Sequence, residues 1–204
     1  MNYADYSRGA SPDINRRSNI LFYETGTANV PSLNTNTYVP GAVADHLTSA
    51  GGDLFGNDQM SILRWLEAGA IASYGTVTEP CARQQKFPQA SVLVKYYCLG
   101  NTAVEAYLKS VQWPAQGVFV GDPLARPFGT KATFMHGTLN VTTTSLDPGV
   151  TYALYSAPSS TGPFTQVGTV SVPNYQFVTI TAAGKSAPFY KLEDTKAPKR
   201  ELAR

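Results

Sequence analysis

The segment ASYGTVTEPC, residues 72–81, decides how the first part of this chain is interpreted. It begins with small, aromatic and β-branched residues, as is typical of a buried strand, and it runs directly into Glu79, Pro80 and Cys81. Strand ends in open parallel sheets face the binding crevice, so an acid and a thiol at this position are candidate catalytic groups. The surrounding sequence must then supply a base to activate the thiol.

Composition limits the kinds of protein that this chain can be. It has 204 residues, 43% hydrophobic and 15% charged, which predicts a globular protein with one ordinary core or two small ones. The net charge is +2, and basic residues gather only at Arg16-Arg17 and in the tail KAPKRELAR, 196–204. Without a basic stripe interleaved with aromatic residues, we expect no nucleic-acid partner. No segment has the length of a membrane span and none resembles a signal peptide, so we expect no transmembrane protein.

Residues 18–129 are predicted to form an α/β domain after a polar N-terminal segment, 1–17. Apolar runs at 19–25, 70–77 and 117–121 have strand character. Helices are expected at 41–52, at 59–69 with Asn57 or Asp58 as cap, at 88–100, and at 103–113 with Asn101 or Thr102 as cap and a core stripe of Val104, Tyr107, Leu108 and Val111. This alternation predicts a parallel or mixed sheet with helices on its faces.

From about Lys131 the pattern changes to strands alone. Short β-branched and aromatic runs, separated by turn-forming residues, occupy 132–146, 151–157, 164–172, 176–183 and 187–194. They predict a small antiparallel β-sandwich at 130–194, with the boundary near Gly129, followed by a basic tail at 195–204.

Three segments carry a family resemblance by their sequence and order: YVPGAVADHLTSAGG (38–52), ILRWLEAGAIASYGTVTEPC (62–81) and KFPQASVLVKYYCLGNTAVEAYLKSVQWPAQGVFVGDPLARPF (86–128). Together they resemble the C-terminal half of an uncharacterised bacterial protein family found alongside exosortase protein-sorting systems. The residues after 150 are similar to the small β-sandwich modules that end many exported bacterial surface proteins, with FYKLED, 189–194, as the closing strand. These resemblances imply an extracytoplasmic or cell-surface location but no particular reaction.

The order of GAIASYG, 69–75, and Gly121-Asp122-Pro123 distantly resembles that of caspase-like peptidases of the gingipain type. That resemblance implies a nucleophile before the helix at Met60, where this sequence has no cysteine, and a general-base histidine in a first half that this chain lacks. Cys81 follows the next strand and so departs from the pattern. We therefore expect a partial caspase-like domain.

The candidate catalytic residues are Cys81, His46 and Glu79. Cys81 needs a base within hydrogen-bond reach, and of the two histidines only His46 belongs to the same predicted domain, because His136 falls in the sandwich. If 41–52 is a helix, Asp45 points about 100° away from His46, so the pair does not share one face.

Asp45, Glu79 and Asp122 are candidate binding residues. Glu79 at a strand end could accept hydrogen bonds from a ligand or from loop amides, and Asp122 is interpreted as a turn-forming residue. Cys81 and Cys98 form no CxxC pair, and no phosphate loop occurs, so we expect no metal and no cofactor. Cys98 is predicted to be a structural thiol in a helix.

Three hypotheses about function remain open. The first is a non-catalytic or accessory protein of cell-surface protein export, and the second is a cysteine hydrolase that uses Cys81 with His46 or with a first half supplied elsewhere. The third is a carbohydrate- or surface-binding protein that acts through the sandwich. A sheet that begins at 19–25 leaves an apolar edge, so a missing N-terminal half or a second copy is an expected partner unless residues 1–17 cover that edge.

Overall fold

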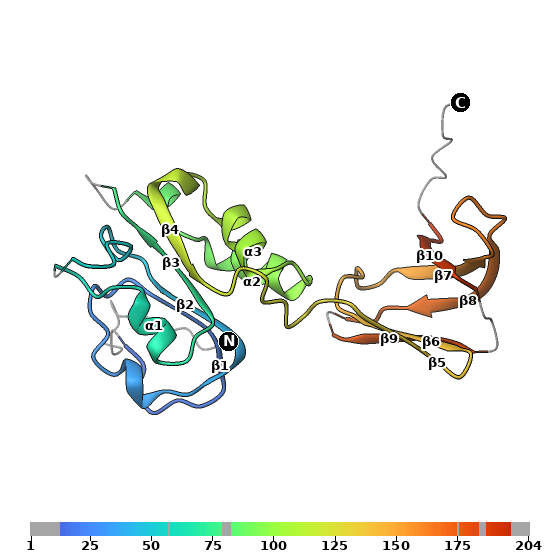
Figure 1. Cartoon of the computed structure of the whole chain (residues 1–204), viewed down its shortest axis with the longest axis horizontal. Coiled ribbons are helices and arrows are strands. Elements are labelled where there is room, and N and C mark those ends of the chain that lie inside the picture. Colours follow the sequence, from blue (N-terminus) through green and yellow to red (C-terminus); the bar gives the residue numbers. More distant parts are fainter. Residues whose placement is uncertain (1–12, 57, 79–82, 175, 184–186, 197–204) are drawn as a thin grey trace. The chain divides into compact units, whose positions relative to one another are not determined.

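The structure, a computed structural model, describes residues 13–56, 58–78, 83–174, 176–183 and 187–196. The chain divides into two compact units (Figure 1), of which the first ends at Pro127 and the second begins at Phe128.

The first unit contains a four-stranded mixed sheet with the strand order β1-β2-β3-β4. Its strands are β1 (Ile20–Thr25), β2 (Tyr38–His46), β3 (Ala72–Thr76) and β4 (Gly117–Gly121). The first three strands run parallel and β4 runs antiparallel to β3. The helices are α1 (Leu63–Glu67), α2 (Ala90–Cys98) and α3 (Ala103–Ser110), with short 3-10 turns η2 (Leu33–Thr35), η3 (Gln84–Lys86) and η4 (Pro114–Gln116). The prediction of a mixed sheet with helices is therefore confirmed.

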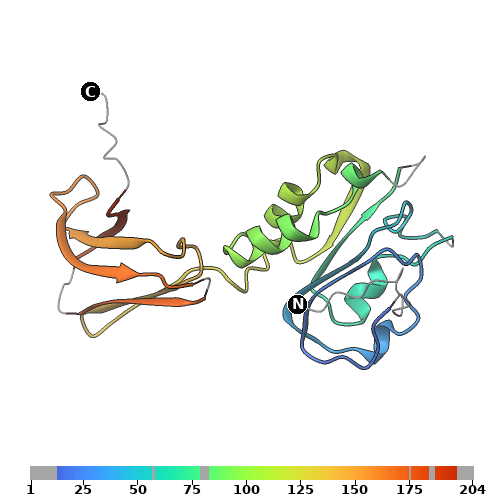
Figure 2. The ribbon, with the colours of Figure 1, turned by 180° about the vertical axis from the view of Figure 1, so that it is seen from behind.

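Helices cover both faces of this sheet. Phe22 and Tyr23 are neighbours in β1 and so point to opposite faces. The ring of Tyr23 packs edge-on against Trp65 of α1, with centroids 5.0 Å apart, and the ring of Phe22 packs against Tyr97 of α2 at 5.9 Å. Thus α1 lies on one face, while α2 and its neighbour α3 lie on the other (Figures 1 and 2).

The predicted helix at 41–52 is wrong, because residues 41–46 belong to β2. All six of these residues are buried, since the strand lies in the middle of a parallel sheet with helices on both faces. Such a strand shows a continuous apolar run instead of alternation, and periodicity alone does not separate it from a buried helix. The helix predicted at 59–69 is also shorter, because α1 begins only at Leu63, with Ile62 at the capping position.

The last helix of this unit follows the prediction at its start, but it ends at Ser110 and its buried stripe differs. Thr102 is the cap, and it forms a reciprocal capping box with Glu105. Tyr107 is fully buried, but Leu108 is 51% exposed, so the predicted stripe is shifted. The stripe that faces the sheet consists of Ala103, Ala106, Tyr107 and Ser110.

The second unit consists of two antiparallel three-stranded sheets, β5-β6-β9 and β10-β7-β8. The strands are β5 (Lys131–Met135), β6 (Thr138–Thr143), β7 (Thr151–Ala157), β8 (Thr165–Ser171), β9 (Val178–Ala183) and β10 (Phe189–Asp194). The run predicted at 132–146 is thus a hairpin, which turns at His136 and Gly137, both with positive φ. Leu154 of one sheet and Ile180 of the other belong to the same buried cluster, so the two sheets pack as a sandwich.

Candidate functional site

The carboxyl ends of the three parallel strands meet at one edge of the first unit's sheet. Thr25, His46 and Thr76 are the last residues of β1, β2 and β3, and Glu24 and Asp45 lie one position earlier in their strands. Asp45, His46 and Thr76 are all buried. Because α/β proteins place ligands outside the carboxyl ends of parallel strands, this edge is the candidate site.

Asp45 bridges the gap that opens between β2 and β3. Val43 and Ala72 form the one residue pair that joins these strands in the described chain. Beyond it, one carboxylate oxygen of Asp45 accepts hydrogen bonds from the backbone N–H of Tyr74 at 2.6 Å and from the Ser73 hydroxyl at 3.0 Å. The other oxygen accepts from the Tyr107 hydroxyl of α3 at 2.8 Å. The carboxylate therefore replaces the missing ladder bonds and ties both strands to the helix layer.

Burial makes the acids at this edge unusually weak. It raises the pKa of Asp45 to about 7, although its three hydrogen-bond donors act in the opposite direction. Glu24 is the register partner of Asp45 on β1, and burial together with the charge of Asp45 raises the pKa of Glu24 to about 8. Two adjacent carboxyl groups in this environment favour retention of at least one proton near neutral pH.

His46 lies on the opposite face of the sheet from Asp45, because successive strand residues alternate. Its Nδ1 accepts a hydrogen bond of 3.0 Å from the indole N–H of Trp65, and the side chain is 1% exposed. Burial lowers the pKa of His46, while the backbone of Met60 opposes this shift. A neutral imidazole has one acceptor nitrogen, so the bond from Trp65 places the proton on Nε2 and uses the acceptor.

Residues 47–52 fold over the same edge and cover it. The N–H of Gly52 donates to the Thr76 carbonyl at 2.9 Å, and the Thr76 hydroxyl donates to the carbonyls of Thr48 and Ser49. A Cβ atom on Gly52 would lie 2.3 Å from the Gly75 carbonyl oxygen, so glycine is required for this close approach. Gly51-Gly52 therefore brings the loop against β3, and the pair does not end a helix as the expected helix at 41–52 implied.

The structure separates most of the residues predicted as site candidates. Cys81 and Glu79 lie outside the described residues. Asp122 follows β4 at the opposite edge, because Gly121 pairs with Ala72 at the start of β3. Its carboxylate accepts a hydrogen bond of 2.9 Å from the N–H of Leu124, as in a local turn.

Lys86 is the buried cation nearest in sequence to the predicted catalytic segment, and it was not singled out from the sequence. Its side chain is 1% exposed, and its Nζ donates to the carbonyl of Thr78. Lys86 therefore links its own segment to Thr78, just after the end of β3. Cys98 lies half-buried in α2, where burial raises the pKa of its thiol.

Of the three hydrogen-bond contacts of Asp45, the sequence carries a partial signal for one and none for the other two. Tyr107 was predicted as core, and a buried tyrosine hydroxyl usually has a hydrogen-bond partner, which is the one available signal. Ser73 and Tyr74 carried no signal, because their contact with Asp45 depends on the pairing of β2 with β3.

The second unit offers aromatic side chains, but a lysine packs against two of them. The Nζ of Lys191 lies 5.3 Å from the ring centroid of Tyr155 and 4.3 Å from that of Phe164. The same ammonium group forms an ion pair of 2.7 Å with Glu193. Each of these rings therefore contacts a lysine of the same unit through one of its faces.

Comparison with protein-family models, curated proteins and solved structures finds no match. In the described ranges, no three His, Cys, Asp or Glu side chains are grouped so that they could hold a metal ion. None of the helices built from described residues combines the length and the apolar character needed to cross a membrane.

Replacement of Asp45 by alanine is expected to lower the free energy of unfolding of the first unit by roughly 2–4 kcal/mol, because it leaves buried donors unpaired. Both tryptophans, Trp65 and Trp113, belong to this unit, so urea denaturation followed by tryptophan fluorescence reports on it alone. Asp122→Ala is the matched control and should change stability by less than about 1 kcal/mol. Equal losses in the two variants would contradict the bridging role of Asp45.

The first unit is also expected to lose stability as pH rises from about 4.5 to 8 through the titration of Glu24. Its folded pKa is raised from 4.5 to about 8, so the folded state binds the proton more tightly than the unfolded state. Glu24→Gln should remove roughly 1–2 kcal/mol of this dependence, a discounted value because the side chain keeps some contact with solvent. The lowered pKa of His46 acts in the opposite direction, so the variant must be compared with the unmodified protein at pH 5 and pH 8.5. Parallel stability curves would refute the shift.

Proposed function

We propose that this chain is a non-catalytic, accessory protein of a bacterial cell-surface protein export or sorting system. The observation that carries the non-catalytic part is the hydrogen bond from Trp65 to Nδ1 of His46. A general base needs an unshared electron pair directed at the proton that it removes, and the acceptor nitrogen of this imidazole is already used.

The other polar groups at the carboxyl edge support the same proposal. Asp45 has three donors and no exposed surface, and the Thr76 hydroxyl bonds the loop that covers the edge. Each of these groups serves the packing of the strands. An arrangement of this kind stabilises a rigid scaffold, and the described residues of this edge present no activated nucleophile or base to a substrate.

The export setting rests on the resemblance of residues 19–128 to the exosortase-associated family and of the sandwich to modules of exported surface proteins. An extracytoplasmic location is part of the same proposal. A small antiparallel sandwich after an α/β unit is compatible with it, although sandwiches serve many functions.

The rival proposal is a caspase-like cysteine hydrolase that uses Cys81 with His46 or with a first half supplied elsewhere, and only the first form can be weighed on the described residues. One observation favours it: β2 and β3 are parallel neighbours, so His46 and the residues that follow Thr76 leave the sheet at the same edge. A parallel core covered by helices on both faces is also compatible with a partial caspase-like domain. The form with His46 as base would require His46 to give up its bond with Trp65, because only then could Nδ1 accept a proton.

The alkylation rate of Cys81 separates the two proposals. In the Cys98→Ser variant Cys81 is the only cysteine, and its reaction with iodoacetamide should follow an ordinary thiol titration with a midpoint at about pH 8.5. His46→Gln should leave this midpoint unchanged, because the imidazole does not activate the thiol. A midpoint below about 7 that moves upward in His46→Gln, with peptide hydrolysis that disappears in Cys81→Ser, would support the hydrolase instead.

We further propose that the outer edge of β1 is a contact for a partner, either a second copy of this chain or a separate polypeptide that supplies further strands. β2 is the one strand that pairs with β1 in the described part of the chain. The backbone N–H of Ile14 donates to the hydroxyl of Tyr23. The backbone N–H of Arg17 donates to the side chain of Asn36, which lies in the β1–β2 connection. An open strand edge presents N–H and C=O groups that a neighbouring strand can pair with.

Sedimentation velocity at micromolar concentration tests this contact. We expect concentration-dependent self-association that is retained when residues 1–12 are deleted and is weakened by Leu21→Lys, because a charge on an edge strand opposes pairing. Ser171→Lys in the second unit is the matched control and should have no effect. A monomer whose behaviour is unchanged by the deletion would show that the sheet needs no further strand.

A further inference from the structure

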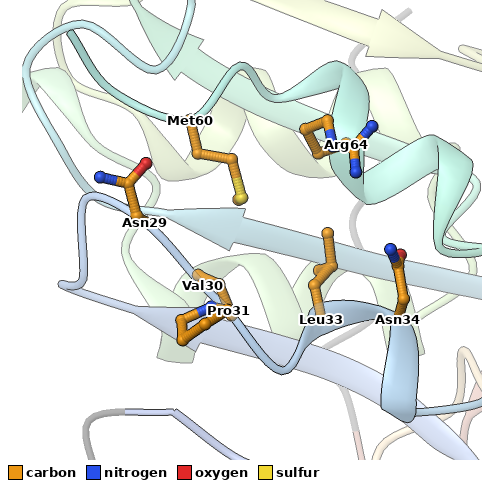
Figure 3. Close-up of a pocket in the computed structure, with 7 residues that line it drawn as sticks. All are labelled: Asn29, Val30, Pro31, Leu33, Asn34, Met60 and Arg64. Carbon is orange, nitrogen blue, oxygen red and sulfur yellow. The ribbon is translucent and has the colours of Figure 1, made fainter.

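The first unit has a slot of about 270 Å³ between the β1–β2 connection and the segment that leads into α1 (Figure 3). Val30 and Leu33 in its lining are only 4% and 3% exposed, so they offer a ligand little apolar surface. Arg64, also in the lining, already pairs with Glu67. The slot therefore indicates no class of ligand.

In the second unit, the inner face of β5 is uncovered. Phe134 is the register partner of Leu139 in β6, and Leu139 packs against the buried cluster of the sandwich. Cross-strand partners point to the same face of a sheet, so Phe134 faces the interior. Phe134 is nevertheless 52% exposed, and all five residues of β5 are exposed. The opposite sheet therefore does not extend over β5.

The outer edge of β10 lies on the same side of the sandwich. The two sheets have the orders β5-β6-β9 and β10-β7-β8, and β8 contacts β9. In face-to-face packing, the strands at the other ends of these orders, β5 and β10, then lie together on the opposite side. β7 is the one strand that pairs with β10 in the described part of the chain. We call this side the β5–β10 flank, and one more strand beside β10 would cover Phe134.

We propose that the β5–β10 flank is the surface through which two copies of this chain associate. β10 of one copy pairs antiparallel with β10 of the other about a two-fold axis at Leu192, which extends the sheet across both copies. The same axis brings the two β5 strands toward each other, so each copy covers Phe134 of the other. A two-fold interface uses one surface twice in this way. The proposal depends neither on the accessory function nor on the contact at β1.

The charges of β10 favour a second copy as the occupant. Leu192 packs against the buried cluster, so its neighbours Lys191 and Glu193 point outward. A two-fold axis normal to the sheet keeps inner faces together, so it must pass through a residue pair of the same position. Within β10 the overlap is longest for 189–193, centred on Lys191, or for 190–194, centred on Leu192.

These two registers differ in which charges they place opposite each other. Centring on Lys191 puts two ammonium groups directly opposite, which is destabilising. Centring on Leu192 puts Lys191 of each copy opposite Glu193 of the other, which gives two favourable cross-strand pairs. The sequence of β10 is thus complementary to itself in the second register.

The ion pair within β10 does not oppose this arrangement. Lys191 and Glu193 of one chain are 2.7 Å apart, with side chains 39% and 52% exposed. In the register centred on Leu192 the four charges alternate in sign, so each ammonium group has one carboxylate along its own strand and one across. An ammonium group has three donors and a carboxylate has two acceptor oxygens, so the existing pair need not break.

Exchange of the two charges tests the proposal in the full chain. All variants carry Leu21→Lys, which weakens pairing at β1, and sedimentation equilibrium covers about 10–300 µM because a single strand pair makes a small, weak interface. We expect the Leu21→Lys chain to dimerise. Lys191→Glu and Glu193→Lys should each weaken this dimer about tenfold, because each places like charges opposite. An equimolar mixture of these two variants should form a heterodimer, because every cross-strand pair then has opposite signs.

Two neighbours in β5 test the cover over Phe134. Phe134→Ser should weaken the dimer by a few-fold, because it removes apolar surface that the second copy buries. Met135→Ser is the matched control, because Met135 is 61% exposed but points to the other face. It should leave the dissociation constant unchanged.

Three results would overturn the proposal: a Leu21→Lys chain that stays monomeric throughout the range, a mixture of the two charge variants that does not associate, or equal effects of Phe134→Ser and Met135→Ser. The first result would leave the flank to a strand of a different polypeptide. If a single charge variant loses its fold, the chain that carries both exchanges replaces it. That chain keeps an ion pair within β10 and should dimerise like the Leu21→Lys chain, and a monomer would again reject the register.

Discussion

The buried carboxylate of Asp45 holds the first unit together where its central strands separate. β2 and β3 share one residue pair, and past that pair their backbone groups would face a gap in the protein interior. Unpaired backbone donors are costly in the protein interior. The Asp45 side chain replaces the missing backbone hydrogen bonds between the strands, because it accepts from Tyr74 and also from Ser73 and Tyr107. The position of α3 and the path of the loop that fills the gap depend on this contact.

The same constraint explains why two adjacent residues, Asp45 and His46, have different surroundings. Strand geometry directs them to opposite faces, where Tyr107 of α3 meets one and Trp65 of α1 meets the other. Each buried polar group thus has its partner in a different helical layer. The layers cannot shift without leaving a donor or an acceptor unsatisfied, which restricts movement at the carboxyl edge.

The sequence predicts the elements that have local signals and misses those that depend on distant contacts. Strands at 19–25, 70–77 and 117–121 and the helices before and after Gly100 are found, because apolar runs, caps and glycines mark them. β2 is missed because a strand buried on both faces looks like a buried helix segment. The role of Asp45 is missed for the same reason, and because its partners Ser73 and Tyr107 are 28 and 62 positions away in the chain.

The choice between an accessory protein and a hydrolase with His46 as its base depends on one electron pair of that residue. To use it as a base, the protein must break the bond with Trp65 and leave a buried indole N–H unpaired, a loss of roughly 1–3 kcal/mol. The ring has little space to turn, because a Cβ atom on Gly51 would lie only 2.7 Å from Nε2. The loop bonded to Thr76 must also leave the edge before a substrate can reach the ring. A scaffold needs none of these changes, and the present arrangement of bonds therefore opposes the use of His46 as a general base.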